Sequence, residues 1–135
     1  MQGLARQSGI FYTLFVALVG WCIPGSGFFF LNERKRSAII FVTICLTFTA
    51  GLYIGSVAVV DPATEKINFV AQMFNSPLVA LLGRITVSNK LSVYGKPAEI
   101  GQIYTSISGM LNLLCIVNTT YLAWLKWQKK AGVQR

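Results

Sequence analysis

A glycine-rich turn that leads into a basic cluster is the first place where this sequence could hold a ligand. The stretch WCIPGSGFFFLNERKR, residues 21–36, joins a Pro-Gly-Ser-Gly turn to Arg34, Lys35 and Arg36. Such a turn could cradle a phosphate, but a P-loop requires GxxxxGK[ST] between a strand and a helix, and this stretch lacks that pattern. We therefore interpret it as a hairpin turn at a membrane surface, where the basic side chains attract anionic lipid headgroups.

Side chains for catalysis or metal binding are scarce. The chain has no histidine, and Cys22, Cys45 and Cys115 lie singly in apolar runs, without the spacing of a metal or redox pair. The sequence also offers no carboxylate pair and no nucleophilic serine motif. We therefore expect no catalytic residue, no metal site and no cofactor of the chain's own. Lipid, carotenoid or chlorophyll is expected only as a peripheral contact, because there is no histidine to bind a chlorophyll magnesium.

Glycines and asparagines within the apolar runs indicate helix packing instead. Gly51 and Gly55 form a GxxxG pattern, which lets a second helix backbone approach closely. Asn112 and Asn118 carry amides that need hydrogen-bond partners beyond their own helix when hydrocarbon surrounds them. We expect all four residues to pack helices together, within the chain or between subunits. A contact between the asparagines and a ligand or ion is the alternative.

The composition indicates that these residues belong to membrane helices. Of the 135 residues, 54% are hydrophobic and only 12% are charged, whereas about 25% are charged in an ordinary soluble domain. We predict an all-α membrane protein that forms a single domain over residues 1–135. It has three transmembrane helices, at about 10–31, 37–60 and 104–125, each long enough to cross a hydrocarbon core.

The predicted outer loop, residues 61–103, is expected to be structured. Its apolar stretch NFVAQMFNSPLVALLG is broken into pieces too short to cross, and Ser76 followed by Pro77 is typical of a helix start, with Gly83 as a stop. We expect a short interfacial or re-entrant helix there. The alternation of apolar and polar residues in RITVSNKLSVYG, residues 84–95, predicts a small β-hairpin.

The distribution of Lys and Arg predicts the orientation. The net charge is +8, from twelve Lys and Arg against four Asp and Glu. These basic residues flank the apolar runs, as the positive-inside rule describes, so no nucleic-acid partner is expected. With three spans, the basic turn at 34–36 and Lys126 share one side of the membrane. We therefore expect the N-terminus outside and the C-terminus in the cytoplasm.

Two motifs resemble those of a family of small bacterial multi-span membrane proteins of unknown function. The first is PGxGxxxL, at residues 24–31, and a basic turn follows it; the second is EIGxxYT…GxLNLL, at residues 99–114. The first motif is also similar to the glycine-rich turn of the two-helix membrane domain. The resemblance implies a multi-span fold in a bacterial inner membrane and no assigned activity. Relatives tend to carry an acidic residue where this chain has Asn118, so the one intramembrane charge that suggests proton or ion handling is missing here.

Three functions are compatible with these features. We expect a non-catalytic accessory subunit of a larger membrane complex, in particular a photosynthetic or respiratory energy-converting assembly, with other membrane subunits and lipids as partners. The alternative is a self-associating channel or small transporter that uses the GxxxG pattern and the asparagines. The third is a membrane-anchored binding module whose 61–103 loop captures a partner. Ion and proton relays need ionisable groups within the spans, and their absence from the predicted spans favours the subunit.

Overall fold

Every regular element that the structure describes is a helix. The computed structural model describes residues 2–60, 66–89, 95–130 and 132. In chain order its elements are α1 (Gln2–Cys22), α2 (Ser26–Phe30), α3 (Arg34–Gly55), the 3₁₀ helix η1 (Val57–Val59), α4 (Lys66–Met73), α5 (Leu78–Ser88) and α6 (Lys96–Lys130). The prediction of an all-α chain is confirmed for these residues.

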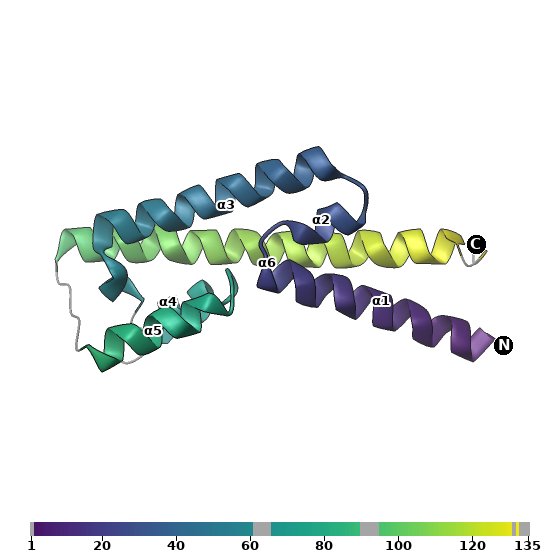
Figure 1. Cartoon of the computed structure of the whole chain (residues 1–135), viewed down its shortest axis with the longest axis horizontal. Coiled ribbons are helices and arrows are strands. Elements are labelled where there is room, and N and C mark those ends of the chain that lie inside the picture. The colour runs from purple at the N-terminus through teal and green to yellow at the C-terminus, as the bar shows by residue number, and fades with distance from the viewer. Residues whose placement is uncertain (1, 61–65, 90–94, 131, 133–135) are drawn as a thin grey trace.

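The longest helix, α6, is the axis along which the other helices are arranged (Figure 1). Helix α3 lies antiparallel to it, α1 covers its C-terminal half and α4 covers its N-terminal half. The buried side of α6 consists mostly of small and polar residues: Ala98, Gly101, Thr105, Ser108, Gly109, Asn112, Thr119 and Ala123. Small side chains let neighbouring backbones come close, which is how helices pack when hydrocarbon surrounds them.

The two halves of the chain have the same order of elements and run in opposite directions (Figure 1). In the first half, α1 ends at a turn, α2 returns, and the long helix α3 follows. In the second half, α4 ends at a turn, α5 returns, and the long helix α6 follows. Helices α1 and α4 approach each other from opposite ends of α6, and their C-terminal ends meet near its middle. The fold is therefore a pair of helical hairpins that face each other beside α6.

Two helices, α3 and α6, are long and apolar enough to cross a membrane. The predicted span at 37–60 corresponds to α3, which begins and ends a few residues earlier, and the predicted span at 104–125 lies within the longer α6. The predicted span at 10–31 is not a single helix, because it is divided between α1 and α2. Three transmembrane helices are therefore not confirmed: the described residues form two candidate spans, and the first predicted segment is divided between two helices.

The break between α1 and α2 follows from the residues at the turn. Pro24 supplies no backbone donor to continue α1, and Gly25 adopts φ = 75°, in the left-handed region that favours glycine. The Ser26 hydroxyl donates to the carbonyl of Val19 at 2.8 Å, and the Ser37 hydroxyl donates to the carbonyl of Gly25 at 2.9 Å. These two bonds hold the turn against the end of α1 and the start of α3.

Because the chain turns back here, the beginning of α1 and the end of α6 lie at the same end of the molecule (Figure 1). Gly9 of α1 is buried directly against the indole ring of Trp127 in α6. The prediction that the two termini lie on opposite sides depended on a first helix that crosses completely. In the structure α1 ends near the middle of α6.

The predicted outer loop contains the second hairpin. Helices α4 and α5 lie on either side of Ser76 and Pro77, where the sequence predicts a helix start, and the Ser76 hydroxyl accepts a hydrogen bond from the backbone N–H of Leu78 at 3.3 Å. Gly83 does not stop the helix, because α5 continues through it to Ser88.

The β-hairpin predicted at 84–95 is wrong over 84–88, which belong to α5. Thr86 explains the difference, since its hydroxyl lies 3.1 Å from the carbonyl oxygen of Leu82 within the helix and 3.2 Å from that of Val57 in η1. Contact with η1 therefore fixes one side of α5. The remainder of the predicted hairpin falls largely on residues 90–94, which lie outside the described part of the chain.

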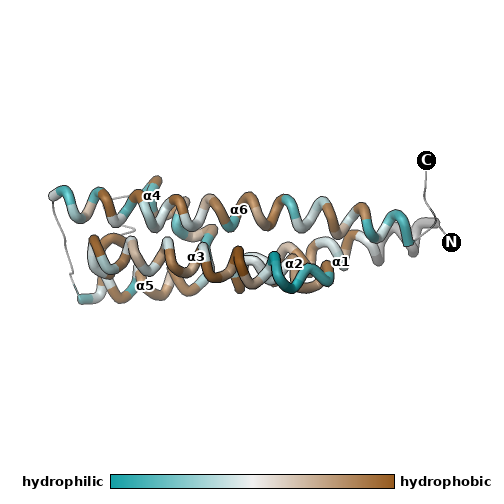
Figure 2. Tube along the Cα trace, turned by 90° about the horizontal axis from the view of Figure 1, so that it is seen from above, coloured by the Kyte–Doolittle hydropathy of each residue, from teal (hydrophilic) through white to brown (hydrophobic). Residues whose placement is uncertain are grey.

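The apolar core is small and lies where α1, α2 and α6 meet. It consists of Val16, Phe28, Leu31 and Ala123, all at most 2% exposed. Most other large apolar side chains are on the outside, and Figure 2 shows hydrophobic residues along much of every long helix, with hydrophilic residues at the start of α3 and at both ends of α6. An apolar exterior and a partly polar interior are what helices in hydrocarbon require.

Candidate functional site at the junction of the two hairpins

The C-terminal ends of α1 and α4 meet against α6, and side chains link them. Nε1 of Trp21 donates to the carbonyl of Met73 at 2.9 Å, and the Ser76 hydroxyl donates to the carbonyl of Cys22 at 3.3 Å. The last carbonyls of a helix have no partner within it, and burying an unpaired carbonyl costs free energy. Each helix end therefore receives a donor from the other hairpin.

Asn112 is the central residue of this junction. Its side chain is fully buried, and its Nδ2 lies 3.2 Å from the carbonyl oxygen of Gly20, 2.9 Å from that of Phe74 and 3.1 Å from that of Asn75. The first carbonyl belongs to the end of α1 and the other two follow α4. A single amide group on α6 thus satisfies the ends of both hairpins.

The buried polar side of α6 continues this network toward its N-terminal end. Nε2 of Gln72, on α4, donates to the Thr105 hydroxyl at 2.8 Å. The Ser108 hydroxyl lies 3.1 Å from the carbonyl oxygen of Ile44 and 3.2 Å from Oδ1 of Asn75. These contacts join α3, α4 and α6 through groups that are buried and neutral.

Two oxygens in the network have no hydrogen-bond partner among the described groups. They are Oε1 of Gln72 and Oδ1 of Asn112, and both side chains are 0% exposed. In the described part of the chain, no three His, Cys, Asp or Glu side chains come together as metal ligands would. The side chains that the structure describes at the junction contribute neutral amides, hydroxyls and one indole N–H.

Glycines bring the backbones of α3 and α6 together. Gly51 and Gly55, the residues of the GxxxG pattern, are both buried and face α6. A Cβ at Gly51 would lie 2.9 Å from the carbonyl oxygen of Gly101, and one at Gly55 would lie 3.1 Å from the Cα of Gly101. The structure places the pattern in contact with α6 of the same chain, where side chains on all three residues would separate the helices.

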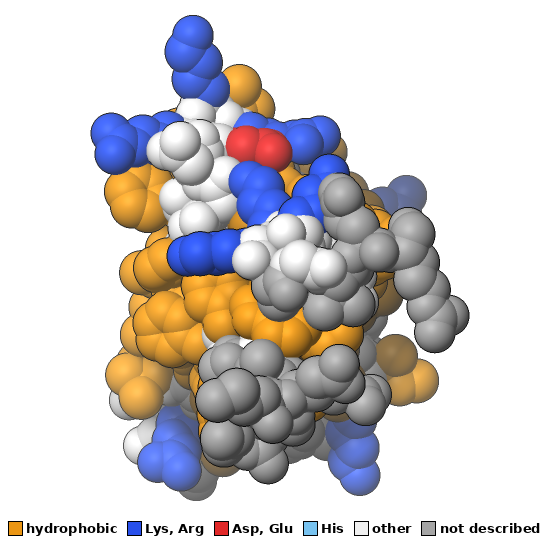
Figure 3. All heavy atoms as spheres, turned by 90° about the vertical axis from the view of Figure 1, so that its right-hand side faces the viewer, with side chains coloured by type: hydrophobic (Ala, Val, Ile, Leu, Met, Phe, Trp, Pro, Cys, Tyr) orange, Lys and Arg blue, Asp and Glu red, His pale blue; other side chains and the backbone are white. Residues whose placement is uncertain are grey.

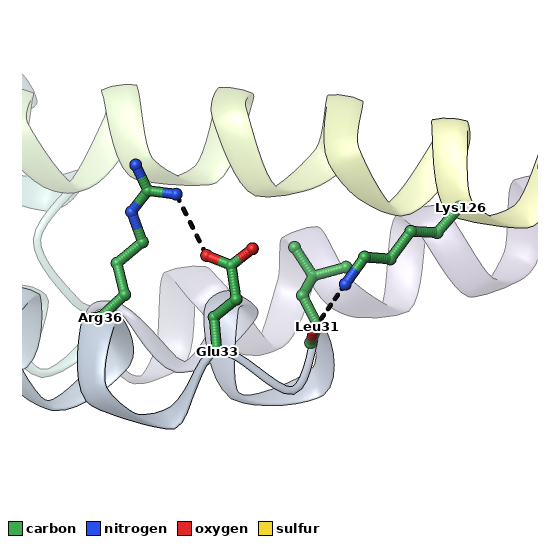
Figure 4. Close-up of polar contacts among 4 residues, drawn as sticks. All are labelled: Leu31, Glu33, Arg36 and Lys126. Carbon is green, nitrogen blue, oxygen red and sulfur yellow. Dashed lines mark hydrogen bonds and ion pairs between the residues drawn. The ribbon is translucent and has the colours of Figure 1, made fainter.

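The predicted lipid-facing residues Arg34, Lys35 and Arg36 begin α3, and Lys126 lies near the end of α6. Figure 3 shows Lys and Arg side chains gathered on this side of the molecule. Arg36 pairs with Glu33 at 3.1 Å, and Nζ of Lys126 donates to the carbonyl of Leu31 at 2.5 Å (Figure 4). Lys126 therefore ties the end of α6 to the turn before α3. Lys35 is exposed.

The two predicted asparagines have different environments. Asn112 lies in the junction, whereas Asn118 is exposed on α6 and its side chain makes no hydrogen bond with a described residue. Trp21, Gln72 and Ser76 are not among the site residues predicted from the sequence. Polar residues in an apolar stretch too short to cross, as at 67–83, were a signal that could have revealed the second hairpin's share of the junction.

Comparison with known proteins identifies the family but adds no solved relative. Neither the curated proteins nor the solved structures give a significant match to this chain. The model of a family of unknown function, DUF6677, matches residues 15–130, which include α2 to α6, the end of α1 and the whole junction. The resemblance to a family without assigned function is thereby confirmed, and the chain belongs to the DUF6677 family of unknown function.

Proposed function

We propose that this chain is a non-catalytic subunit of a larger membrane complex, and that the outer side of α6 contacts the partner. The outer side of α6 is here the surface formed by Leu114, Val117, Asn118 and Tyr121, which recur at the spacing of one helix face. The exposed fractions of the three apolar residues are 60% or more.

The observation that carries the proposal is the exposed amide of Asn118 among these apolar side chains. An amide that faces hydrocarbon without a partner is unfavourable by several kcal/mol at most, and about 1–2 kcal/mol is recovered when a neighbouring helix supplies one. Asn118 precedes Lys126 by two turns of α6, about 12 Å at the usual helical rise. A second membrane helix packed on this side would bury the apolar residues and pair the amide.

The membrane location rests on the two long apolar helices and on the distribution of charge. We propose the bacterial inner membrane, with the end that carries Arg34 and Lys126 in the cytoplasm. The basic positions at that end include Arg6, Arg34, Lys35, Arg36, Lys126, Lys129 and Lys130, and the described ones at the other end are Lys66, Arg84 and Lys96. Because α1 turns back, this orientation puts both termini in the cytoplasm, which agrees with the positive-inside rule.

An energy-converting complex, photosynthetic or respiratory, is the host that we propose to examine first. Pigments or lipids would then touch the apolar outer surface, because the chain has no histidine to ligate the magnesium of a chlorophyll. The 61–103 segment is a weaker candidate for partner capture, since its helices α4 and α5 are committed to internal contacts through Gln72, Asn75 and Thr86.

Photo-crosslinking in native membranes tests the partner surface. A photoreactive residue at Val117 is expected to give one discrete crosslinked product with another protein, whereas the same residue at Leu46, an equally exposed position on α3, is not. The product at Val117 should be lost when Asn118→Leu is added. Extraction in mild detergent that always yields a monodisperse small species, with no product at Val117, would contradict the proposal.

A self-associating channel or transporter is the second candidate, and the opposed hairpins favour it. Broken helices of opposite direction that meet near the bilayer midplane form the substrate sites of many transporters. This function predicts solute flux in liposomes that contain only this protein. Flux no greater than in protein-free liposomes would exclude it and would leave the subunit proposal intact.

A further inference from the structure

An apolar groove of about 530 Å³ lies on the side of the molecule where α1, α2 and α3 meet. Ile23, Phe30, Ala38 and Phe41 are among the residues that line it, and Arg34 stands at its end nearest the start of α3. Ser26 and Ser37 also line the groove, but each hydroxyl donates to a backbone carbonyl, of Val19 and of Gly25. The walls therefore present hydrocarbon, apart from one guanidinium.

The charge of Arg34 is not neutralised by any carboxylate in the described part of the chain. Glu33 is occupied by Arg36 at 3.1 Å, and Glu99 lies in the first turn of α6, at the opposite end of the molecule. The Arg34 guanidinium instead lies over the ring of Phe29, 5.5 Å from its centroid. The aromatic ring holds the cation at the mouth of the groove, where an anion can approach it.

We propose that this groove binds one acyl chain of an anionic phospholipid whose phosphate pairs with Arg34. Apolar walls favour a hydrocarbon chain, and a guanidinium pairs well with phosphate oxygens through its fork of N–H donors. The groove has the volume of an ordinary small-ligand site. Its charged end lies with the other basic residues and its apolar end lies toward the junction, which matches the direction of a phospholipid within one leaflet.

The proposal rests on the membrane location argued above but is independent of any partner protein. It is tested with the purified full chain in non-ionic detergent, to which phosphatidylglycerol or phosphatidylcholine of the same chain length is added. Native mass spectrometry then counts the lipids retained. The chain is expected to keep one phosphatidylglycerol, with at least tenfold preference over phosphatidylcholine.

Two variants separate the acyl chain from the headgroup. Ala38→Trp fills the groove and should abolish retention, whereas Val42→Trp, one turn further along α3 and 51% exposed but outside the groove, should not. Arg34→Gln should remove the preference for phosphatidylglycerol, whereas Lys35→Gln should leave most of it. Because Arg34 is exposed, this second pair remains informative even if Ala38→Trp fails to fold.

Equal retention by Ala38→Trp and Val42→Trp would overturn the proposal, as would equal retention of the two lipids by the unmodified chain. Recovery of the chain in the soluble fraction of cells would instead overturn the membrane location on which both proposals depend. Because the lipid measurement uses the isolated chain, its result does not depend on whether the photoreactive residue at Val117 crosslinks to a partner protein.

Discussion

The indole N–H of Trp21 donates to the carbonyl of Met73 across 52 positions of the sequence, so the end of α1 and the end of α4 hold each other. The carbonyls of Cys22 and Met73, the last residues of α1 and α4, accept no backbone N–H from a described residue. The two hairpins therefore depend on one another and on α6, and we expect the described helices to unfold as one cooperative unit.

Trp21→Phe tests the mutual dependence of the hairpins. The substitution keeps an aromatic ring but removes the donor to Met73, and we expect it to lower the free energy of unfolding by about 1 kcal/mol. Trp124→Phe is the control, because the Trp124 ring stacks on Trp127 and its indole N–H makes no hydrogen bond with a described residue. Thermal unfolding in detergent measures both variants. An equal loss in the two would show that the hydrogen bond contributes nothing.

Asn112→Leu removes the donor that serves both helix ends. We expect a loss of about 2–3 kcal/mol, because buried carbonyls are left unpaired, and this loss is partly offset because the unpaired Oδ1 of Asn112 disappears as well. Asn118→Leu is chemically identical and lies on the exposed side of the same helix. In the isolated chain it should change stability by less than about 0.5 kcal/mol. Comparable losses in the two variants would contradict the assigned role of Asn112.

Much of the helical content follows from uncharged apolar runs, but the hairpin geometry does not. The runs around Ile44 and Ser108 are long enough to predict helices from length and hydropathy alone. The run that contains Pro24 is also uncharged and apolar, and the contacts of Ser26 and Ser37 help to turn it back where Pro24 and Gly25 break the helix. Hydrogen bonds of this kind join residues whose proximity cannot be predicted from the periodicity of the sequence.

The residues of the candidate site also could be predicted only in part from the sequence. An amide in an apolar helix needs a hydrogen-bond partner, and this holds for both Asn112 and Asn118. The sequence pattern does not tell which of the two is buried in the junction. Their separation by six positions places them on different sides of α6, but which side faces the hairpins depends on the packing of Gly109 and Thr105. The alternation at residues 84–88 predicts a strand, but a short alternating segment fits a helix as well, and the contact of Thr86 with Val57 favours the helix.

Gly109→Ala tests the close approach of α4 to α6. A Cβ at this position would overlap the backbone carbonyl oxygen of Ala71, which cannot move independently of α4, so we expect a loss of about 2 kcal/mol or more. Gly20→Ala is the matched control, because its Cβ would lie 3.5 Å from the Ile116 side chain and 3.9 Å from the backbone N of Gly27, both ordinary contacts. Alanine also favours a helix by up to about 1 kcal/mol. Gly20→Ala should therefore be neutral or stabilising in the same unfolding assay.

Cysteine labelling tests whether α1 turns back instead of crossing. In a variant with Cys22, Cys45 and Cys115 replaced by alanine, single cysteines are introduced as Gln2→Cys and Lys129→Cys, near the two ends of the chain. Because Gly9 lies against Trp127, both positions belong to the same end of the molecule. A membrane-impermeant maleimide should therefore reach both from the same side, the cytoplasmic one.

Lys66→Cys provides the opposite reference, because Lys66 begins α4 at the other end of α6. It should react in intact spheroplasts, whereas Gln2→Cys and Lys129→Cys should react only in inside-out vesicles. If the maleimide labels Gln2→Cys in intact spheroplasts, as it labels Lys66→Cys, then α1 crosses the bilayer. The two hairpins then do not meet at Asn112 in the membrane. If all three react from one side, α3 and α6 do not span, and the charge asymmetry between the two ends has no topological meaning.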